Sequence, residues 1–299
     1  MLEVNFRVKV FYQAARDLSF TKASRELNIS QPAVSKHIQE LEATIGQALF
    51  LRNGSRLILT EAGRTLMDAV KVIIQEYELV DYKLGLLNNQ IRGNLIIGAS
   101  TTIAQYILPK LIAQFSERNP LVNIKLFTGN TAQVDRWLFE RKIGLGFVEG
   151  MAEEQSLKYS KVWDDQLIWV ARKEHPLFKK SRICLDELRE QEFIFREPGS
   201  GTNDIVFHRL KEFGIHAQDL VNRVQMSSSE SIKQYIRYSN SIGILSQYAV
   251  KQEIEDGILQ QMEVEGFQIH RELNLVHLHG ELSGLPQQFI RFLNQSLRK

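Results

Sequence analysis

The fold of the first part of this chain is decided by residues 30–38, which read SQPAVSKHI. A helix that turns about 100° per residue places four apolar residues on one stripe: Val34, Ile38, Leu41 and Ile45. The opposite face is small, polar and cationic, and it carries Gln31, Pro32, Ser35, Lys36 and Gln39. A helix needs such a face to enter a DNA major groove and touch base edges. The stretch therefore predicts the second helix of a helix-turn-helix.

The ends of the predicted helices are marked by capping residues. Ser30 can accept a hydrogen bond from an orphan backbone N–H at the start of the second helix, and Gly46 ends that helix. Ser19 can cap a shorter helix over residues 20–27, and an earlier helix is expected over residues 6–16. Three consecutive helices joined by tight turns are therefore predicted.

A pair of short strands is predicted after these helices, over residues 49–60, about a turn at Asn53 and Gly54. The turn carries two arginines and so reads as a wing that can reach a minor groove or the phosphates. The candidate DNA-binding residues are Thr21, Arg25, Gln31, Pro32, Ser35, Lys36, Arg52 and Arg56. The alternative is an ordinary three-helix bundle with a polar outer face, since proline and serine are common early in helices.

The run of residues 11–60 closely resembles the winged helix-turn-helix of the LysR-type transcriptional regulators. The matching segments are residues 20–23, Leu27, residues 30–35, Ile38, residues 41–42, Gly46, residues 49–50, Arg52 and residues 59–63. The rest of the chain also resembles this family. Residues 148–150 and 195–202 are most similar to the subgroup that regulates sulfur assimilation and carbon fixation. The resemblance implies a transcriptional regulator that binds double-stranded operator DNA.

Composition and charge are compatible with this reading. The 299 residues allow two or three domains, and the single cysteine, Cys184, fits a reducing compartment. No apolar run reaches membrane-spanning length and the N-terminus has no export signal, so we expect a cytoplasmic protein. The net charge is only +2, but residues 1–60 hold eight Lys and Arg against five Asp and Glu. The positive excess thus lies where phosphate contact is predicted.

A near-heptad apolar pattern comes after the wing and predicts one helix over residues 60–88. Its candidate dimerisation residues are Leu66, Ile73, Tyr77, Val80 and Leu84. Pairing with a second copy would bury this stripe, and the alternative is that the stripe packs against its own domain. The family's linker helix forms a dimer, so the resemblance implies a homodimer or homotetramer. Residues 88–93 read as a hinge.

From residue 93 onward, short apolar strands alternate with helices, which predicts parallel sheets covered by helices. The pattern resembles the two-lobed periplasmic-binding-protein type 2 fold that the family uses as its effector domain. We therefore expect a winged helix-turn-helix at residues 1–59, a linker helix at 60–89 and an α/β effector-binding domain at 90–299. Lobe I would span about 93–162 and 268–299, and lobe II about 163–267.

Hydroxyl-bearing loops come after three of the predicted strands, where open α/β sheets bind their ligands. The resemblance implies that residues of these loops line a cleft between the lobes. The candidate effector-binding residues are Ser100, Thr101, Thr102, Thr131, Glu149, Ser200, Gly201 and Thr202. Plain N-capping is the alternative for any one loop. Glu149 would repel a small dianion unless a cation or hydroxyl lies between them, so a sulfur metabolite such as O-acetylserine, with both an amine and a carboxylate, is one candidate.

Two departures from the family pattern are Gly144, where many members have aspartate, and Asn240, where many have glycine. The sequence contains no catalytic elbow or dinucleotide-binding loop, so we expect neither an enzyme nor a cofactor. His277 and His279 share a strand face but lack an obvious third ligand, so no metal is expected either. Cys184 is expected to be a structural thiol. The rival class is a metabolite-binding or enzymatic α/β protein with a fused DNA-binding domain.

Overall fold

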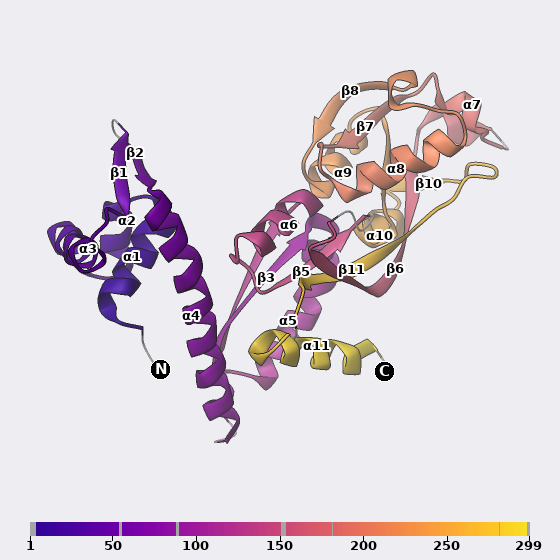
Figure 1. The fold of residues 1–299 in the computed structure, drawn as a ribbon. Coiled ribbons are helices and arrows are strands. Elements are labelled where there is room, and N and C mark those ends of the chain that lie inside the picture. The colour runs from indigo at the N-terminus through magenta and orange to yellow at the C-terminus, as the bar shows by residue number, and fades with distance from the viewer. Residues whose placement is uncertain are drawn as a thin grey trace. The chain divides into compact units, whose positions relative to one another are not determined.

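The computed structural model describes residues 4–53, 56–87, 90–150, 154–180, 182–280 and 282–297. The chain forms two compact units, Met1–Gly93 and Asn94–Lys299, and each is described by itself (Figure 1). Gly54 in the predicted wing turn, and Asn88 and Asn89 in the predicted hinge, lie outside the described residues.

The first unit begins with three helices: α1 (Phe6–Asp17), α2 (Phe20–Glu26) and α3 (Gln31–Ile45). The predicted caps are confirmed, because Ser19 Oγ accepts from the Lys22 backbone N–H at 3.2 Å and Ser30 Oγ accepts from that of Ala33 at 3.3 Å. Gly46 ends α3 in the left-handed region, with φ of 75°. The sequence thus sets these helix boundaries locally.

The core of this unit contains most of the predicted stripe of α3. Val34, Ile38 and Leu41 are buried together with Phe11 of α1. Ile45 was expected on the same stripe, but it is 41 % exposed, so that expectation was wrong. It occupies the last turn of α3, which does not reach the packed cluster.

The wing consists of β1 (Phe50–Asn53) and β2 (Arg56–Leu59), paired antiparallel, and α4 (Glu61–Leu87) comes next. Thr60 caps α4, because its Oγ1 accepts from the Gly63 N–H at 2.9 Å and donates to the Ala48 carbonyl at 2.7 Å. Among the described residues, no helix is both long enough and apolar enough to cross a membrane.

The second unit is built on one mixed sheet in the order β4-β3-β5-β11-β6-β9-β7-β8, with β10 paired to β6. Its strands are β3 (Gly93–Ser100), β4 (Val122–Gly129), β5 (Leu145–Glu149), β6 (Leu157–Arg172), β7 (Glu192–Arg196), β8 (Val221–Met226), β9 (Ile242–Ser246), β10 (Leu259–Met262) and β11 (Ile269–Leu278). Its helices are η1 (Ile103–Ile107), α5 (Leu108–Arg118), α6 (Thr131–Phe139), η2 (Pro176–Lys179), α7 (Leu185–Leu188), α8 (Gly201–Glu212), η3 (Ala217–Asp219), α9 (Ser229–Arg237), α10 (Gln247–Glu255) and α11 (Gly284–Leu297).

Two long strands, β6 and β11, carry the chain between the lobes, and we call them the crossing strands. β11 pairs with β5 in lobe I, whereas the end of β6 pairs with β9 and β10 in lobe II. The sequence predicted only residues 167–171 of β6, because its first half is polar and half-exposed. The register between β6 and β11 shifts at Leu273, and such a bulge bends a sheet.

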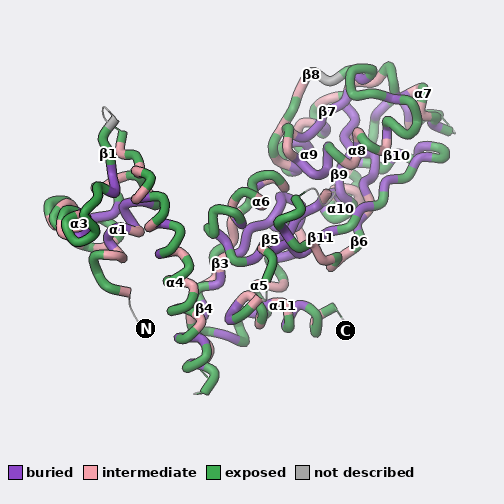
Figure 2. Tube along the Cα trace, in the orientation of Figure 1, coloured by how far each residue is buried: buried purple, intermediate pink, exposed green. Residues whose placement is uncertain are grey.

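The predicted parallel pairing is confirmed within each lobe, where β3 pairs with β5 and β7 pairs with both β8 and β9 in parallel. The central strands β5, β7 and β9 are buried almost throughout, and the outer faces of the helices are exposed (Figure 2). In lobe II, Trp169 and Phe193 belong to one apolar cluster, and Ile168 and Ile194 to another. Alternation along the strands therefore separates two cores, one on each face of the sheet.

Candidate functional site

The polar face of α3 is open to solvent. Gln31, Pro32 and Lys36 are exposed and Ser35 is half-buried. Gln31 Nε2 donates to Ser35 Oγ at 3.0 Å, one helical turn away, which holds the amide against the helix. The remaining predicted DNA-binding residues are also exposed: Thr21 and Arg25 on α2, and Arg52 and Arg56 on the wing. The first unit thus presents a polar, cationic face on adjacent elements.

The apolar stripe of α4 divides into two parts. Leu66 packs against the core of its own unit, so the alternative reading holds for the first turns of the helix. Further along, Ile73, Tyr77, Val80 and Leu84 are 37–45 % exposed. These four residues form an exposed apolar stripe on one side of a helix, and such a stripe gains stability when a partner buries it.

Four of the predicted effector-binding residues hydrogen-bond to Glu149, at the end of β5. Its carboxylate accepts hydrogen bonds from Ser100 Oγ, from Thr102 Oγ1 at 3.3 Å and from Thr202 Oγ1 at 3.3 Å. Thr131 Oγ1 donates to its backbone carbonyl at 2.6 Å. Segments that are far apart in the sequence therefore meet at one buried carboxylate, which is 1 % exposed.

A cation lies beside this carboxylate, as its burial requires. Arg271 Nη1 lies 3.7 Å from Glu149 Oε1, and the same nitrogen donates to Thr202 Oγ1 at 2.9 Å. Arg271 Nη2 donates to Thr102 Oγ1 at 3.4 Å. Arg271 also pairs with Asp165, whose Oδ2 lies 2.7 Å from both Nε and Nη2. These contacts define the Glu149–Arg271 cluster, made of Ser100, Thr102, Glu149, Asp165, Thr202 and Arg271.

Sequence reasoning missed Arg271 and Asp165. The two residues face each other in the register of the crossing strands, and Ser246 Oγ donates to Asp165 Oδ1 at 2.9 Å. The sequence held one signal that could have identified Arg271. In residues 269–275 it alternates with Ile269 and Leu273, so it shares the buried face of a strand with two apolar residues. A charged residue at a buried strand position requires a partner, which the sequence alone did not name.

A second arginine joins Thr101 to lobe II. Arg196, at the end of β7, is 2 % exposed, and its Nη1 donates to Thr101 Oγ1 at 2.7 Å. Its guanidinium also pairs with Glu197, with Nε 2.8 Å from Oε2. Asn130 Nδ2 donates to the other Glu197 oxygen at 3.2 Å. Both lobes therefore contribute to a second polar contact beside the first.

The start of α8 fits tightly against the end of β5. A Cβ added at Gly201 would lie 1.9 Å from the Glu149 carbonyl oxygen, so only glycine fits there. Ser200 is 1 % exposed, and its Oγ is buried with no hydrogen-bond partner. A buried hydroxyl without a partner is rare and marks a position that a ligand can satisfy.

The remaining candidates of the sequence lie elsewhere. His277 Nδ1 contacts the Leu278 carbonyl at 2.7 Å and His279 Nε2 contacts that of Gln155 at 2.9 Å. Burial lowers the pKa of His277 and so favours its neutral form. In the described part of the chain, no three His, Cys, Asp or Glu residues are grouped as a metal site would require.

Gly144, where many family members have aspartate, lies away from the Glu149–Arg271 cluster. A Cβ added there would lie 3.4 Å from Pro286, which is ordinary van der Waals contact.

One expectation about a single residue was wrong, and one departure from the family pattern is mild. Cys184 is exposed at the start of α7, where its N–H donates to Glu187 Oε2 at 2.9 Å, so the thiol is not part of a core. Asn240 does not have the left-handed backbone that glycine favours, and its carbonyl contacts His175 Nε2 at 3.0 Å. The substitution of glycine by asparagine is therefore accommodated without strain.

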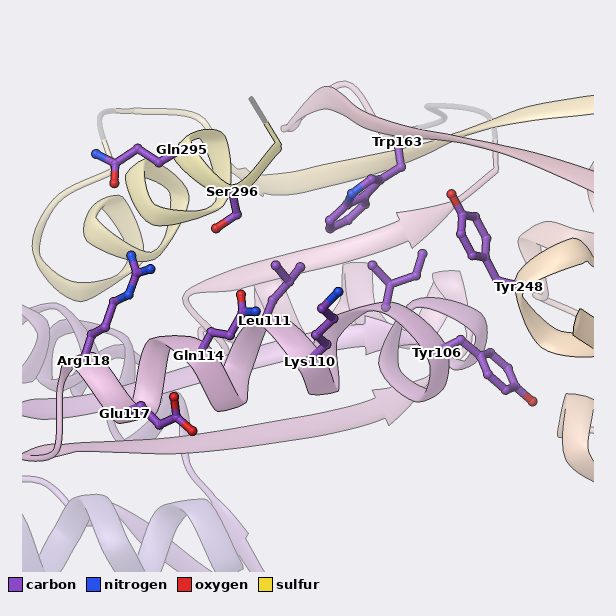
Figure 3. Close-up of a pocket in the computed structure, with 11 residues that line it drawn as sticks. Tyr106, Lys110, Leu111, Gln114, Glu117, Arg118, Trp163, Tyr248, Gln295 and Ser296 are labelled. Atoms are coloured by element: carbon purple, nitrogen blue, oxygen red, sulfur yellow. The ribbon is translucent and has the colours of Figure 1, made fainter. Parts of the chain in front are cut away.

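A surface pocket of about 560 Å³ lies along α5, between this helix, α11, β6 and α10 (Figure 3). None of the predicted effector-binding residues lines it. Its wall consists of Tyr106, Ile107, Lys110, Leu111, Gln114, Glu117, Arg118, Trp163, Tyr248, Gln295 and Ser296. The pocket and the Glu149–Arg271 cluster are therefore distinct features of the second unit.

Comparisons with known proteins agree with this geometry. Residues 7–64 match the model of the bacterial regulatory helix-turn-helix proteins of the lysR family, and residues 88–298 match the LysR substrate binding domain. The chain is therefore a member of the LysR family, a transcriptional regulator with a two-lobed effector domain rather than an enzyme.

Two curated relatives fall in the subgroup that the sequence indicated. The RuBisCO operon transcriptional regulator of Allochromatium vinosum is 31 % identical over 92 % of this chain and 90 % of its own length. The HTH-type transcriptional regulator CysL of Bacillus subtilis is 28 % identical over 90 % of this chain and 89 % of its own length.

Two solved structures share the fold. The CcmR regulatory domain of Synechocystis, in complex with 2-PG, has a TM-score of 0.64 and 28 % identity, covering 70 % of this chain and 99 % of that one. Full-length CbnR with its target DNA has a TM-score of 0.67 and 18 % identity, covering 98 % and 100 %.

Proposed function

We propose that this regulator senses a small polar metabolite between its two lobes, at the Glu149–Arg271 cluster. The observation that carries the proposal is the bridge made by Thr102 and Thr202, which lie just after strands of different lobes and both bond Glu149 and Arg271. A ligand that takes over these hydroxyls contacts both lobes at once. Only such differential contact lets binding shift the balance between two lobe arrangements.

The effector-binding residues in this proposal are those expected from the sequence, Ser100, Thr101, Thr102, Thr131, Glu149, Ser200, Gly201 and Thr202, together with Arg196 and Arg271. Buried hydroxyls, arginines and the N-terminal end of α8 favour a ligand with an anionic group. Glu149 favours an additional donor on that ligand. A sulfur or carbon metabolite with these features agrees with the names of CysL and the RuBisCO operon regulator and with the 2-PG of the CcmR complex.

We propose further that α3 enters the major groove of operator DNA, while Arg52 and Arg56 of the wing contact the backbone. The exposed polar face of α3 supports this assignment. The exposed stripe on α4 would pair two chains into a homodimer, and effector domains would join two dimers into a homotetramer. Such an assembly would bind two half-sites of the operator. Because operator DNA is its target, we place the protein in the cytoplasm.

The decisive experiment replaces both bridging hydroxyls, Thr102→Ala with Thr202→Ala, in the full-length protein. Operator affinity is measured by fluorescence anisotropy with and without O-acetylserine or 2-PG. For the wild type we expect a shift of about 5- to 150-fold with the correct metabolite, the usual range of coupling between sites. The double variant should lose this shift and keep its affinity for DNA without metabolite.

Thr128→Ala is the matched control, because Thr128 is an exposed threonine on β4 outside the cluster. It should respond like the wild type. An unchanged dose dependence in the double variant would contradict the interlobe site. Loss of DNA binding without metabolite would instead assign these hydroxyls a role in folding.

A further inference from the structure

Tyr106 makes a third polar contact between the lobes, away from the Glu149–Arg271 cluster. It lies in η1 of lobe I, and its hydroxyl donates to Glu230 Oε1 of α9 in lobe II. Lys233 of α9 lies beneath the ring, with Nζ 5.2 Å from the ring centroid. Lys233 pairs with Glu230 at 2.8 Å and with Glu253 of α10 at 2.6 Å. We call these four residues the Tyr106 cluster.

The ring of Tyr106 also packs against lobe II. It contacts the apolar cluster around Ile168, Val170 and Ile236. Burial, together with the bond to Glu230, raises the pKa of the Tyr106 hydroxyl, so the neutral donor persists at any physiological pH. Lys233 is buried, with 5 % of its side chain exposed, and its two carboxylate partners balance its charge. One side chain of lobe I is therefore fixed in lobe II by a hydrogen bond, a ring–cation contact and apolar packing.

A short π-helix connects this contact to the effector-binding residues. η1 begins directly after Thr102, and the Leu108 N–H bonds the Ile103 carbonyl, five residues back. Such turns are rare, and they often occur at functional sites. An α-helical turn contains one residue fewer than a π-turn. If η1 converted to an ordinary α-helix, the residues on either side of it would rotate relative to one another by about 100°. Tyr106 therefore lies in the turn that directly follows Thr102, and a shift of this turn would change the direction of its side chain.

Glu253 has an incomplete set of partners. Its Oε1 pairs with Lys233, whereas its Oε2 is buried and has no hydrogen-bond partner. A buried carboxylate oxygen without a donor is costly, so Glu253 is incompletely satisfied in the lobe arrangement of this structure.

We propose that Tyr106 is an interlobe latch that couples the effector-binding residues Thr101 and Thr102 to α9 and α10 of lobe II. The latch stabilises the lobe arrangement seen here. A ligand that draws on the hydroxyl of Thr102 shifts η1, withdraws Tyr106 from Glu230 and Lys233, and releases lobe II. The regulatory part of this inference rests on the proposed function, but the coupling itself is measurable without any metabolite.

The first test is Tyr106→Phe, which removes the hydroxyl and keeps the ring over Lys233. Hydrogen exchange of the full-length protein, without metabolite, is measured at residues 103–108 and 229–237. Loss of a hydrogen bond to a charged group should speed exchange about tenfold in both segments. Tyr238→Phe is the matched control, because Tyr238 is 78 % exposed at the end of α9, and it should change neither segment.

The second test asks whether the two sites are coupled. Thr102→Val alters only the effector end, yet it should speed exchange at residues 229–237, and this effect should vanish in a Tyr106→Phe background. Glu230→Gln, which keeps an acceptor for Tyr106, should change exchange less than Glu230→Ala.

The latch is refuted by a Tyr106→Phe variant that exchanges like Tyr238→Phe, or by additive effects of Thr102→Val and Tyr106→Phe. If neither metabolite changes operator affinity but Thr102→Val and Tyr106→Phe are still coupled in hydrogen exchange, the proposed effector site is wrong and the latch is supported.

Discussion

Replacement of Arg271 by methionine tests the electrostatic centre of the effector domain. The guanidinium lies within 2.7 Å of Asp165 and 3.7 Å of Glu149, and no part of its side chain is exposed. Arg271→Met leaves two buried carboxylates without their cation. Removing one partner of a buried ion pair costs about 3–5 kcal/mol, because the remaining charge stays desolvated. We expect the free energy of unfolding to fall by about this amount.

Urea unfolding monitored by tryptophan fluorescence measures this change. All three tryptophans, Trp137, Trp163 and Trp169, lie in the second unit, so the signal reports that unit alone. With a slope of about 2–3 kcal/mol per molar urea, the midpoint should fall by about 1–2.5 M.

Asp165→Asn supplies the matched comparison. Combined with Arg271→Met, it removes one of the two unpaired charges and should recover part of the lost midpoint. A midpoint in Arg271→Met within about 0.2 M of the wild type, corresponding to about 0.5 kcal/mol, would refute the assignment of Arg271 as the counter-ion.

Three further outcomes are expected. Gln31→Ala should weaken operator binding by about 1–3 kcal/mol in anisotropy titrations and leave binding to random DNA unchanged, and equal weakening on both would remove Gln31 from the base-reading set. Ile73→Glu places a charge on the exposed stripe of α4 and should reduce the mass seen by light scattering, whereas an unchanged mass and operator affinity would exclude the stripe as the dimer seam. Burial lowers the pKa of His175 in the folded protein, so folding favours the neutral imidazole. Its contribution to the free energy of unfolding is complete above the pKa of the unfolded chain, about 6.5, and is lost as the pH falls from there through the lower pKa of the folded protein. The urea midpoint should therefore drop more between pH 7.5 and 5.5 in the wild type than in His175→Asn, and parallel drops would argue against this role.

Much of the first unit was predictable because its signals are local. Ser19, Ser30 and Gly46 act on backbone groups within four residues, so a short window contains both partners. Ile45 was misplaced because the helical period says which face a residue is on, but not where the packed cluster ends.

The sequence also predicted the hydroxyls and Glu149 at the ends of strands, because parallel strands align these ends on one edge of a sheet. The domain boundaries at residues 59 and 89, and the roles of the individual site residues, stay predictions. The first half of β6 was missed because half-exposed polar residues lack the apolar run by which buried strands are recognised.

The sequence by itself determined the helix-turn-helix, the alternation of strands and helices in the second unit, and the polar residues at strand ends. Only the tertiary structure decided which charges neutralise one another. Arg271 and Asp165 are 106 residues apart, and they meet because the crossing strands pair antiparallel in one register. Tyr106 and Glu230 are 124 residues apart and meet across the two lobes. Such partners are chosen by long-range pairing and shared burial, which a local pattern of side chains does not encode.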